Sequence, residues 1–143
     1  MTQQIVLQQL VTFYQTLDST RLTMLAEIYH PDVRLSDPVG EHQGLAVVEQ
    51  YFASLLKNMR YCRFVVTLTR EFDSDALLLW RMEYAHPSLQ GGADQTLEGS
   101  SYLQFREGKV VFQRDYYDMG AMLYEKLPLL GSVIGLVKKR LQP

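Results

Sequence analysis

The sequence is short of the features that mark several common protein classes. It contains one cysteine, Cys62, among 143 residues. An internal disulfide and a cysteine zinc site are therefore not available, and a reducing compartment is favoured. No run of about 18 or more apolar residues occurs, so we expect no transmembrane helix. The first residues, MTQQ, lack the basic start and the apolar run of a signal peptide. These absences predict a cytoplasmic protein.

An excess of charge of one sign is also missing. The formal net charge of −2 at pH 7 gives no electrostatic basis for binding nucleic acid. The three histidines, His30, His42 and His86, are not at the spacing of metal ligands, so we expect no metal. No glycine-rich phosphate loop or nucleophile elbow occurs, and we expect no cofactor. His42 could lie either at a pocket mouth or on an exposed loop.

The residues that are present suit one folded domain. Hydrophobic residues make up 47% of the chain and aromatic residues 11%, which is enough for a sizeable core. Apolar periodicity predicts helices first and then a series of strands. This order is typical of an α+β fold with one curved antiparallel sheet and helices on one face. The expected helices cover residues 2–17, 21–29 and 45–56, and the expected strands cover residues 33–37, 61–72, 76–84, 96–106 and 109–117.

The most informative strand ends at an aspartate. Side chains alternate along a strand, so Val33, Leu35 and Asp37 share one face. Because two of them are apolar, that face is expected to point inward, and Asp37 with it. An inward carboxylate either finds hydrogen-bond partners or has its pKa raised by desolvation. Asp37 is therefore a candidate catalytic group; the alternative is that it caps the turn at Pro38 and Gly40.

Two blocks of sequence resemble a known superfamily. Residues 29–40 read YHPDVRLSDPVG, and residues 98–118 read EGSSYLQFREGKVVFQRDYYD. Together with Gly44 and the helix at 47–52, they resemble the nuclear transport factor 2-like superfamily, which includes SnoaL-like polyketide cyclases, ketosteroid isomerases and limonene epoxide hydrolases. The resemblance covers residues from about 6 to 118. It implies a cone-shaped, cystatin-like domain at 1–118, with three N-terminal helices on the concave face of the sheet, and a homodimer formed through the sheet's outer face.

The resemblance also implies roles for three residues. The Asp-Pro-Val-Gly run is similar to the segment that carries the general base of ketosteroid isomerases, so Asp37 would move a proton beside a carbonyl. Those enzymes also use a tyrosine and a protonated aspartate as an oxyanion hole. At these positions the chain has Phe13, with Tyr14 next to it, and Ser101. Tyr14 and Ser101 are thus the candidate hydrogen-bond donors.

A second acid comes from the last strand. The Arg-Asp-Tyr-Tyr-Asp run resembles the closing strand of limonene epoxide hydrolases and SnoaL-like cyclases, whose first aspartate acts as base or acid. That residue is Asp115, and alternation places it on one face with Val111, Gln113 and Tyr117. Two acids of unequal pKa suit paired acid and base catalysis. We expect Asp37, Asp115 and Tyr14 to be catalytic.

The strand at 76–84 leaves two readings open. A ketosteroid isomerase alignment turns Trp80 and Met82 toward the pocket, whereas the epoxide hydrolase analogy turns Arg81 and Glu83 inward. We prefer the apolar pair, because charged side chains are rarely buried unless they are paired. The expected substrate-binding residues are Tyr29, Phe52, Trp80, Met82, Ser101, Gln113 and Tyr117.

The final segment, 119–143, is apolar and ends in basic residues. It is predicted to be a helical extension packed on the same domain, too short to span a bilayer and interrupted by Pro128, Gly131 and Gly135. The run 138–140, Lys-Lys-Arg, follows. Three roles stay open: a lid or packing helix, a dimer contact, and a helix lying weakly on a membrane surface.

The sequence thus favours a small cofactor-free enzyme for an apolar, oxygen-bearing molecule. Its inward carboxylates would serve isomerisation, cyclisation or epoxide hydrolysis by proton transfer. The alternative is a non-catalytic module of the same fold that binds a hydrophobic ligand or a partner protein. The two hypotheses differ in one structural requirement, since catalysis needs Asp37 and Asp115 to reach a single dry pocket.

Overall fold

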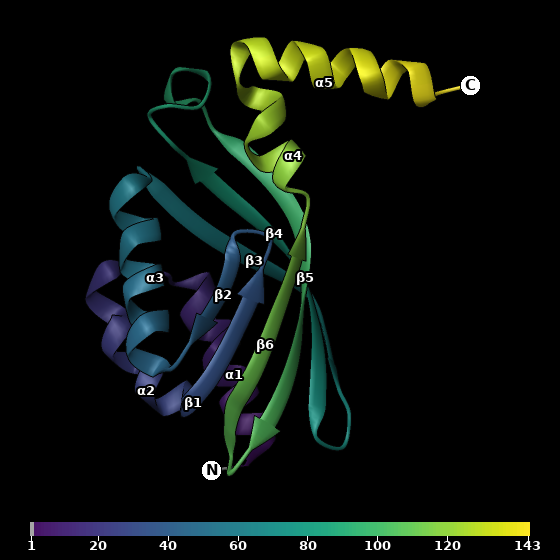
Figure 1. Ribbon diagram of the computed structural model, residues 1–143. Coiled ribbons are helices and arrows are strands. Elements are labelled where there is room, and N and C mark those ends of the chain that lie inside the picture. The colour runs from purple at the N-terminus through teal and green to yellow at the C-terminus, as the bar shows by residue number, and fades with distance from the viewer. Residues whose placement is uncertain (1) are drawn as a thin grey trace.

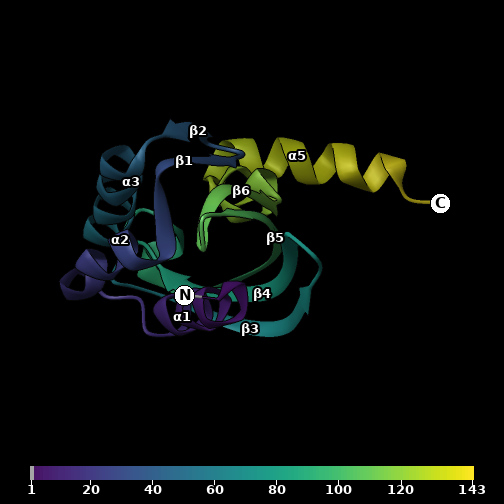
Figure 2. The same cartoon turned by 90° about the horizontal axis from the view of Figure 1, so that it is seen from below.

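The computed structural model describes residues 2–143, and its strands form a single curved sheet. The order of the strands across the sheet is β2-β1-β6-β5-β4-β3. In Figure 2 the sheet curls into an open C, from β2 at one end to β3 at the other. The strands are β1 (Tyr29–Asp37), β2 (Gly40–Gln43), β3 (Tyr61–Glu71), β4 (Asp75–Ala85), β5 (Gln95–Arg106) and β6 (Lys109–Tyr117).

Helices cover the side toward which the sheet curves. Figure 1 and Figure 2 show α1 and α3 on this side, with the C-terminal helices at one end of the cone. The predicted α+β cone is confirmed. The α-helices are α1 (Gln3–Gln15), α2 (Leu25–Ile28), α3 (Leu45–Asn58), α4 (Met119–Met122) and α5 (Pro128–Leu141), and the 3-10 helices are η1 (Ser19–Met24), η2 (Gln90–Gly92) and η3 (Tyr124–Lys126).

One strand pair corrects the prediction of a fully antiparallel sheet. β1 runs parallel to β6, with Leu35 opposite Gln113 and Ser36 opposite Arg114. The other four pairs are antiparallel. Alternation along a strand fixes which side chains share a face, but it does not determine which strands become neighbours. The sequence pattern therefore could not reveal this pairing.

The region around β1 also differs from its predicted boundaries. The second helix is a 3-10 helix followed by the single turn α2, and β1 begins directly after it at Tyr29. Residues 30–32, His-Pro-Asp, fall between the expected helix at 21–29 and the expected strand at 33–37, but they lie within β1. The short strand β2 was not expected, because Gly40–Gln43 has no apolar residue to give a strand pattern. It forms a hairpin with β1, and this hairpin orients Asp37.

The core lies between α1, α3 and the sheet. Thr2 caps α1 by accepting a hydrogen bond from the Ile5 N–H, and the helix then buries Val6, Leu10 and Phe13 completely. Full burial of such side chains stabilises a fold by about 1.5–3 kcal/mol each. Because α1 is held in this way, the next residue, Tyr14, points from the helix into the concave side of the sheet, where the candidate site lies.

Candidate active site

A small apolar pocket lies on the concave side of the sheet, and both Asp37 and Asp115 line it. Its volume is about 40 Å³, which leaves room for only a few atoms of a ligand. Tyr14, Tyr51 and Tyr117 contribute phenol rings to the wall. The apolar part of the wall consists of Leu35, Phe52, Leu55, Phe64, Trp80, Met82 and Met122.

Asp37 is held by three hydrogen-bond donors. Its Oδ1 accepts bonds from the backbone N–H groups of Val39 at 2.9 Å and Gly40 at 3.1 Å. Its Oδ2 accepts a bond from the Tyr51 hydroxyl at 2.5 Å. The side chain is only 2% exposed. Asp37 therefore caps the turn and faces the interior at once, so the two alternatives that the sequence left open are both met, and the carboxylate is fixed in one orientation.

Tyr51 and His42 complete the surroundings of Asp37. Burial raises the pKa of Tyr51, and the hydrogen bond to Asp37 raises it further, so Tyr51 stays a neutral donor. His42, on β2, stacks on Tyr51 with ring centroids 3.8 Å apart. Its Nε2 lies 3.8 Å from Asp37 Oδ1, beyond hydrogen-bonding distance. His42 is thus beside the carboxylate and not on an exposed loop.

Asp115 is held through one of its two oxygens. Asp115 Oδ1 accepts hydrogen bonds from Ser101 Oγ at 2.6 Å and from Gln113 Nε2 at 2.8 Å. Burial raises the pKa of Asp115 to about 6 against the lowering effect of these two bonds, and the negative charge of Asp37 adds to the rise. Since both bonds end on Oδ1, we infer that Oδ2 is the oxygen that can reach a ligand.

Trp80 is fixed by the same serine. The indole Nε1–H donates to Ser101 Oγ at 2.9 Å, and the Ser101 hydroxyl in turn donates to Asp115. On the neighbouring strand β5, Gly99 lies opposite Trp80. A Cβ at Gly99 would lie 2.3 Å from Trp80 Cη2. Gly99 therefore provides the space that the indole ring occupies.

Tyr14, Tyr29 and Gln113 form a closed cycle of buried hydrogen bonds. Tyr29 donates to Gln113 Oε1 at 2.5 Å, and Gln113 Nε2 donates to the Tyr14 hydroxyl at 2.9 Å. The third side joins the Tyr14 and Tyr29 hydroxyls at 3.1 Å. Because the Tyr29 hydroxyl already donates its proton to Gln113, Tyr14 is the donor of this third bond and Tyr29 the acceptor.

The cycle has two consequences for the site. The Tyr14 hydroxyl is engaged within the protein, although its ring lines the pocket, so in this arrangement it has no proton left for a substrate oxygen. Burial raises the pKa of both Tyr14 and Tyr29, which keeps them neutral. Gln113 donates its second amide hydrogen to Asp115. The cycle therefore orients the amide that holds the Asp115 carboxyl group.

The structure divides the predicted site residues into two layers. Tyr14, Asp37, Phe52, Trp80, Met82, Asp115 and Tyr117 line the pocket. Tyr29, Ser101 and Gln113, predicted to bind substrate, are buried behind this wall, because the side chains of Tyr14 and Asp115 lie in front of them. We therefore assign these three to positioning, and we do not expect them to contact a ligand.

The strand at 76–84 presents its apolar row to the pocket. Trp80 and Met82 line it, whereas Glu83 forms ion pairs with Arg63 and Arg81 on the other face of the sheet. The charged residues of the epoxide hydrolase analogy thus lie outside the pocket.

Several pocket residues are not among the predicted site residues, and Tyr51 is the most important of them. The periodicity of α3 placed Tyr51 on the broad apolar face next to Phe52, so the sequence showed that it was inward but not that it reached Asp37. Leu35, Leu55 and Phe64 are apolar side chains whose sequence pattern distinguishes an inward face but not a place in the pocket wall. Met122 belongs to α4, in a segment with no pattern that predicts its neighbours.

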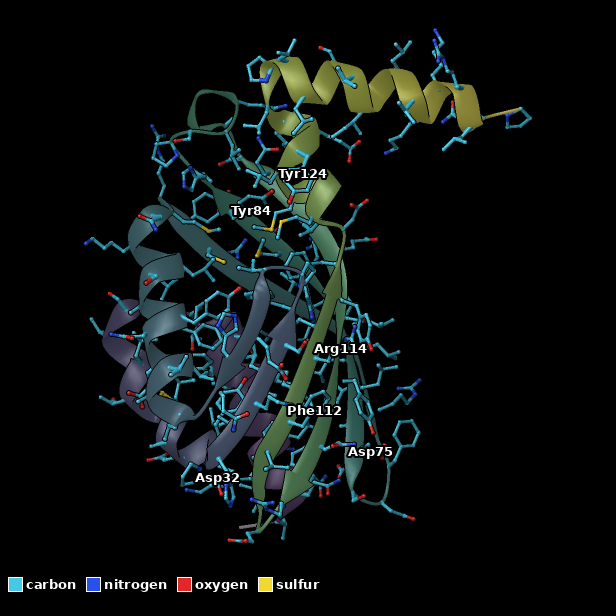
Figure 3. All side chains as sticks on the ribbon, viewed as in Figure 1. Asp32, Asp75, Tyr84, Phe112, Arg114 and Tyr124 are labelled. Atoms are coloured by element: carbon cyan, nitrogen blue, oxygen red, sulfur yellow. The ribbon has the colours of Figure 1, made fainter. Side chains whose placement is uncertain are left out.

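A larger apolar groove continues from the pocket toward the C-terminal helices. Tyr51, Leu55, Tyr117 and Met122 line both, and the groove has a volume of about 350 Å³. The Tyr84 hydroxyl donates to the Met122 carbonyl at 3.0 Å, and Figure 3 shows Tyr84 at the foot of α4. This bond fixes the backbone at Met122, whose side chain lines both the pocket and the groove. The remaining lining of the groove is Val39, Ser54, Asn58, Met59, His86, Ser88, Leu89, Leu123 and Leu127.

Within residues 2–143, no cluster of three or more His, Cys, Asp or Glu side chains could hold a metal ion. None of the helices in this part of the chain is long and apolar enough to cross a bilayer.

Solved structures with the same fold come from several bacteria. A nuclear transport factor 2-like protein of unknown function from Burkholderia pseudomallei superimposes with a TM-score of 0.73 at 18% identity, covering 86% of this chain and 96% of the other. A protein from Jannaschia, provisionally described as a SnoaL-like polyketide cyclase, gives 0.71 at 13% identity, with coverage of 82% and 88%. AclR from Streptomyces galilaeus, provisionally described as a hydroxylase, gives 0.68 at 18% identity, with coverage of 91% and 96%.

These identities are low, so the likeness concerns the fold. No functionally curated protein matches the chain. A family model does match, and it spans residues 10–113, from within α1 to the middle of β6. The matched region carries Asp37, the pocket wall of β4 and the Gln113 that holds Asp115. The resemblance seen in the sequence is confirmed: the chain belongs to the SnoaL-like domain family.

Proposed function

We propose that this protein is a SnoaL-like enzyme that transfers a proton on a small, apolar, oxygen-bearing substrate. The observation that carries the proposal is that Asp37 and Asp115 line one apolar pocket. Carboxylates are seldom placed in an apolar enclosure for stability alone, because their desolvation is costly. Two such groups in one pocket are typical of acid and base catalysis.

The hydrogen bonds suggest a different role for each acid. Both oxygens of Asp37 accept hydrogen bonds, as suits a carboxylate that acts as the base. Asp37 would accept a proton from a substrate carbon or from an attacking water. Asp115 would donate a proton from Oδ2 to the substrate oxygen, so that the negative charge on that oxygen is neutralised as it forms. In an isomerisation, Asp37 then returns its proton to another carbon of the product, and Asp115 takes its proton back from the oxygen. After a water addition, Asp37 releases its proton to solvent and Asp115 is reprotonated from solvent.

The pKa of Asp115 supports its role as the proton donor. A pKa of about 6 leaves a fraction of this acid protonated near neutral pH, where an ordinary aspartic acid is fully ionised. The rate should therefore rise as the pH falls toward 6. If Asp115 acted as the base instead, the rate would fall over the same range.

The shape of the site suggests the substrate class. The inner pocket admits only a few atoms, while the adjoining groove of about 350 Å³ is lined largely by apolar side chains. A ligand would place its reacting oxygen between the acids and its apolar body in the groove. The descriptions of two structural neighbours, as polyketide cyclase and hydroxylase, are compatible with such a substrate. Polyketide-type ketones, ketosteroids and terpene epoxides are therefore the first molecules to test.

The test compares turnover of such a panel by the wild-type protein, Asp37→Asn and Asp115→Asn. Each substitution keeps the size of the side chain and replaces its carboxyl group by an amide that cannot transfer the proton. Asp73→Asn is the matched control, because Asp73 is exposed in the turn between β3 and β4. We expect a loss of at least about 100-fold in kcat for each pocket variant and none for the control. Equal rates for all four proteins would refute the proposal.

A second candidate, non-catalytic binding of an apolar molecule, is favoured by the small volume of the inner pocket. The groove alone could hold such a ligand, with Tyr51, Leu55 and Met122 in contact. In that case Asp37→Asn and Asp115→Asn would leave ligand affinity unchanged, and no substrate of the panel would be turned over. Fluorescence titration with an environment-sensitive apolar dye measures occupancy of the groove in each variant.

We also propose, as the family resemblance implies, that two copies associate through the outer face of the sheet and that the protein works in the cytoplasm. Analytical ultracentrifugation of the wild type tests the first point. A reversed charge on that face, Arg63→Glu, should weaken the association, since Arg63 is exposed there and the substitution changes the charge of the face in both copies at once.

A further inference from the structure

Helix α5 extends away from the rest of the protein. Figure 1 and Figure 2 show that it runs sideways from the end of the cone, with most of its length beyond the sheet. Its attachment is on one side, at η3. Gly131 lies against the Glu125 backbone, where a Cβ would come within 2.3 Å of the carbonyl oxygen, and Lys138 pairs with Glu125 at 2.9 Å. These contacts fix the direction of the helix and leave its opposite side uncovered.

The uncovered side is a continuous apolar face. The face consists of Leu129, Val133, Leu136, Val137 and Leu141. Successive members are four, three, one and four residues apart, so they lie along one side of the helix. Their exposed fractions are 81%, 53%, 55%, 51% and 81%. Single exposed apolar residues are ordinary, but a contiguous face of this kind marks an interaction surface.

The charge of α5 differs from that of the whole chain. The helix sequence, PLLGSVIGLVKKRL, contains no acidic residue, and Lys138, Lys139 and Arg140 lie in its last turn. The complete chain has a formal net charge of −2. Lys138 is paired with Glu125, so Lys139 and Arg140 are the positive charges displayed at the end of the projecting helix, beside the apolar face. This combination complements a surface that is apolar inside and negatively charged outside.

The width of the apolar face argues for a flat surface and against a second helix. At about 100° per residue, the face reaches from Leu136 to Leu141 across an arc of roughly 140°. The seam between two paired helices is narrower than this, so pairing would leave Leu136 or Leu141 in water. A helix lying in the plane of a lipid surface buries about half of its circumference. Arg140 lies within the arc at its end, and its long side chain can reach the headgroups.

We propose that α5 is an interfacial helix that lays the face from Leu129 to Leu141 into the surface of an anionic membrane. Lys139 and Arg140 contact the lipid headgroups, and the apolar face lies at the level where the acyl chains begin. The cone is then held at the membrane by this helix. The proposal does not depend on catalysis by Asp37 and Asp115. It does place the apolar groove near the lipid, since Met122, Leu123 and Leu127 form one wall of that groove and lead into α5.

The experiment is cosedimentation of the full-length protein with vesicles of phosphatidylcholine, alone or mixed with phosphatidylglycerol. We expect binding to the mixed vesicles, little binding to phosphatidylcholine alone, and release as the salt concentration rises. The double variant Lys139→Gln, Arg140→Gln should bind the mixed vesicles about 30-fold more weakly. The double variant Val133→Ser, Leu136→Ser should also lose binding, and it should fold normally because both residues are exposed.

Matched controls change the same residue types elsewhere. Lys57→Gln removes a positive charge from the last turn of α3, and Ile5→Ser removes an exposed apolar side chain from α1. Neither should affect vesicle binding. Failure of the wild type to bind anionic vesicles would overturn the proposal. So would a dimer, formed without lipid, that the Val133→Ser, Leu136→Ser variant dissociates, because α5 would then be an interface between two copies of the chain.

Discussion

Ser36 of β1 pairs with Arg114 of β6 in the parallel part of the sheet, and the residue that follows each of them is an aspartate. Because both strands run in the same direction, Asp37 and Asp115 reach the same level of the sheet with side chains on the same face. An antiparallel arrangement of these strands would not bring both C-terminal ends to one place. The parallel register is thus the structural reason that two acids far apart in the sequence share a pocket.

The protonation of Asp115 should make the stability of the protein depend on pH. Its pKa rises from 3.8 to about 6 on folding. Between these values the folded protein binds the proton more tightly than the unfolded chain does, so the free energy of unfolding should fall as the pH rises through this window. The decrease should be about 2–3 kcal/mol, complete above pH 6. Urea unfolding at pH 4.5, 5.5 and 7.5 measures it.

The variant Asp115→Asn isolates this contribution. Its Oδ1 can still accept the hydrogen bonds from Ser101 and Gln113, but it carries no charge. We expect it to be more stable than the wild type at pH 7.5, with a smaller loss of stability between pH 4.5 and 7.5. Asp73→Asn, on the exposed turn, should follow the wild type. Parallel pH curves for the wild type and Asp115→Asn would contradict the prediction.

The variant Ser101→Ala should change both neighbours of the serine. Asp115 loses a donor that lowers its pKa, so its pKa should rise further. The Trp80 indole N–H loses its acceptor, and an unpaired buried donor costs about 1–3 kcal/mol of stability. Carbon-13 NMR of labelled aspartate follows the titration of Asp115, and thermal unfolding gives the stability.

Ser100→Ala provides the control for this substitution. Ser100 is the neighbour of Ser101 on β5, and its side chain points to the opposite face of the sheet. It should leave both the titration of Asp115 and the melting temperature nearly unchanged. If Ser101→Ala lowered or did not move the pKa of Asp115, the hydrogen bond would not have the role described.

The sequence predicted the direction of Asp37 and of the β4 side chains because both depend on local alternation. Val33 and Leu35 were enough to turn Asp37 inward, and the apolar character of Trp80 and Met82 selected the inner row of β4. The fold itself followed from the order of helices and strands together with the two sequence blocks around Asp37 and Asp115.

Contacts over long distances in the sequence could not be predicted in this way. The parallel pairing of β1 with β6, the bond from Tyr51 to Asp37 and the cycle of Tyr14, Tyr29 and Gln113 each depend on how separate elements are placed. Helix periodicity indicates that Tyr51 faces inward. Which hydrogen-bond partner its hydroxyl reaches depends on the position of α3 relative to β1 to within a few ångströms. For the same reason, Ser101 and Gln113 were expected at a ligand and were found behind the wall.

The variant Tyr51→Phe should remove the donor that holds Asp37 Oδ2 and keep the aromatic ring that stacks on His42. The carboxylate would then be fixed only by the backbone N–H groups of its turn. We expect turnover of a substrate identified in the panel to fall about 10- to 100-fold, with KM changed little, because orientation of the base is lost while the apolar wall is retained. Steady-state kinetics separates the two parameters.

A similar tyrosine outside the pocket serves as the control for Tyr51→Phe. Tyr61 donates to Asp94 at 2.9 Å on the exposed surface, so Tyr61→Phe removes the same kind of bond without touching the site. It should leave kcat and KM unchanged. A loss of activity in Tyr61→Phe equal to that in Tyr51→Phe would mean that the effect of Tyr51 is not local to Asp37.

The variant Gly99→Ala tests whether the position of Trp80 depends on the missing side chain opposite it. The added methyl group would lie 2.3 Å from Trp80 Cη2, so the indole ring must move and its hydrogen bond to Ser101 must lengthen or break. Overpacking of this kind costs about 1–3 kcal/mol. Because Trp80 is the only tryptophan, its fluorescence reports the displacement directly.

Gly135→Ala is the contrasting change, since nothing lies within 4 Å of its added Cβ and alanine favours helix by about 1 kcal/mol. We expect Gly99→Ala to lower the melting temperature and to shift the fluorescence emission of Trp80, whereas Gly135→Ala should do neither. An unchanged emission spectrum in Gly99→Ala would show that the position of Trp80 does not depend on the missing side chain at residue 99.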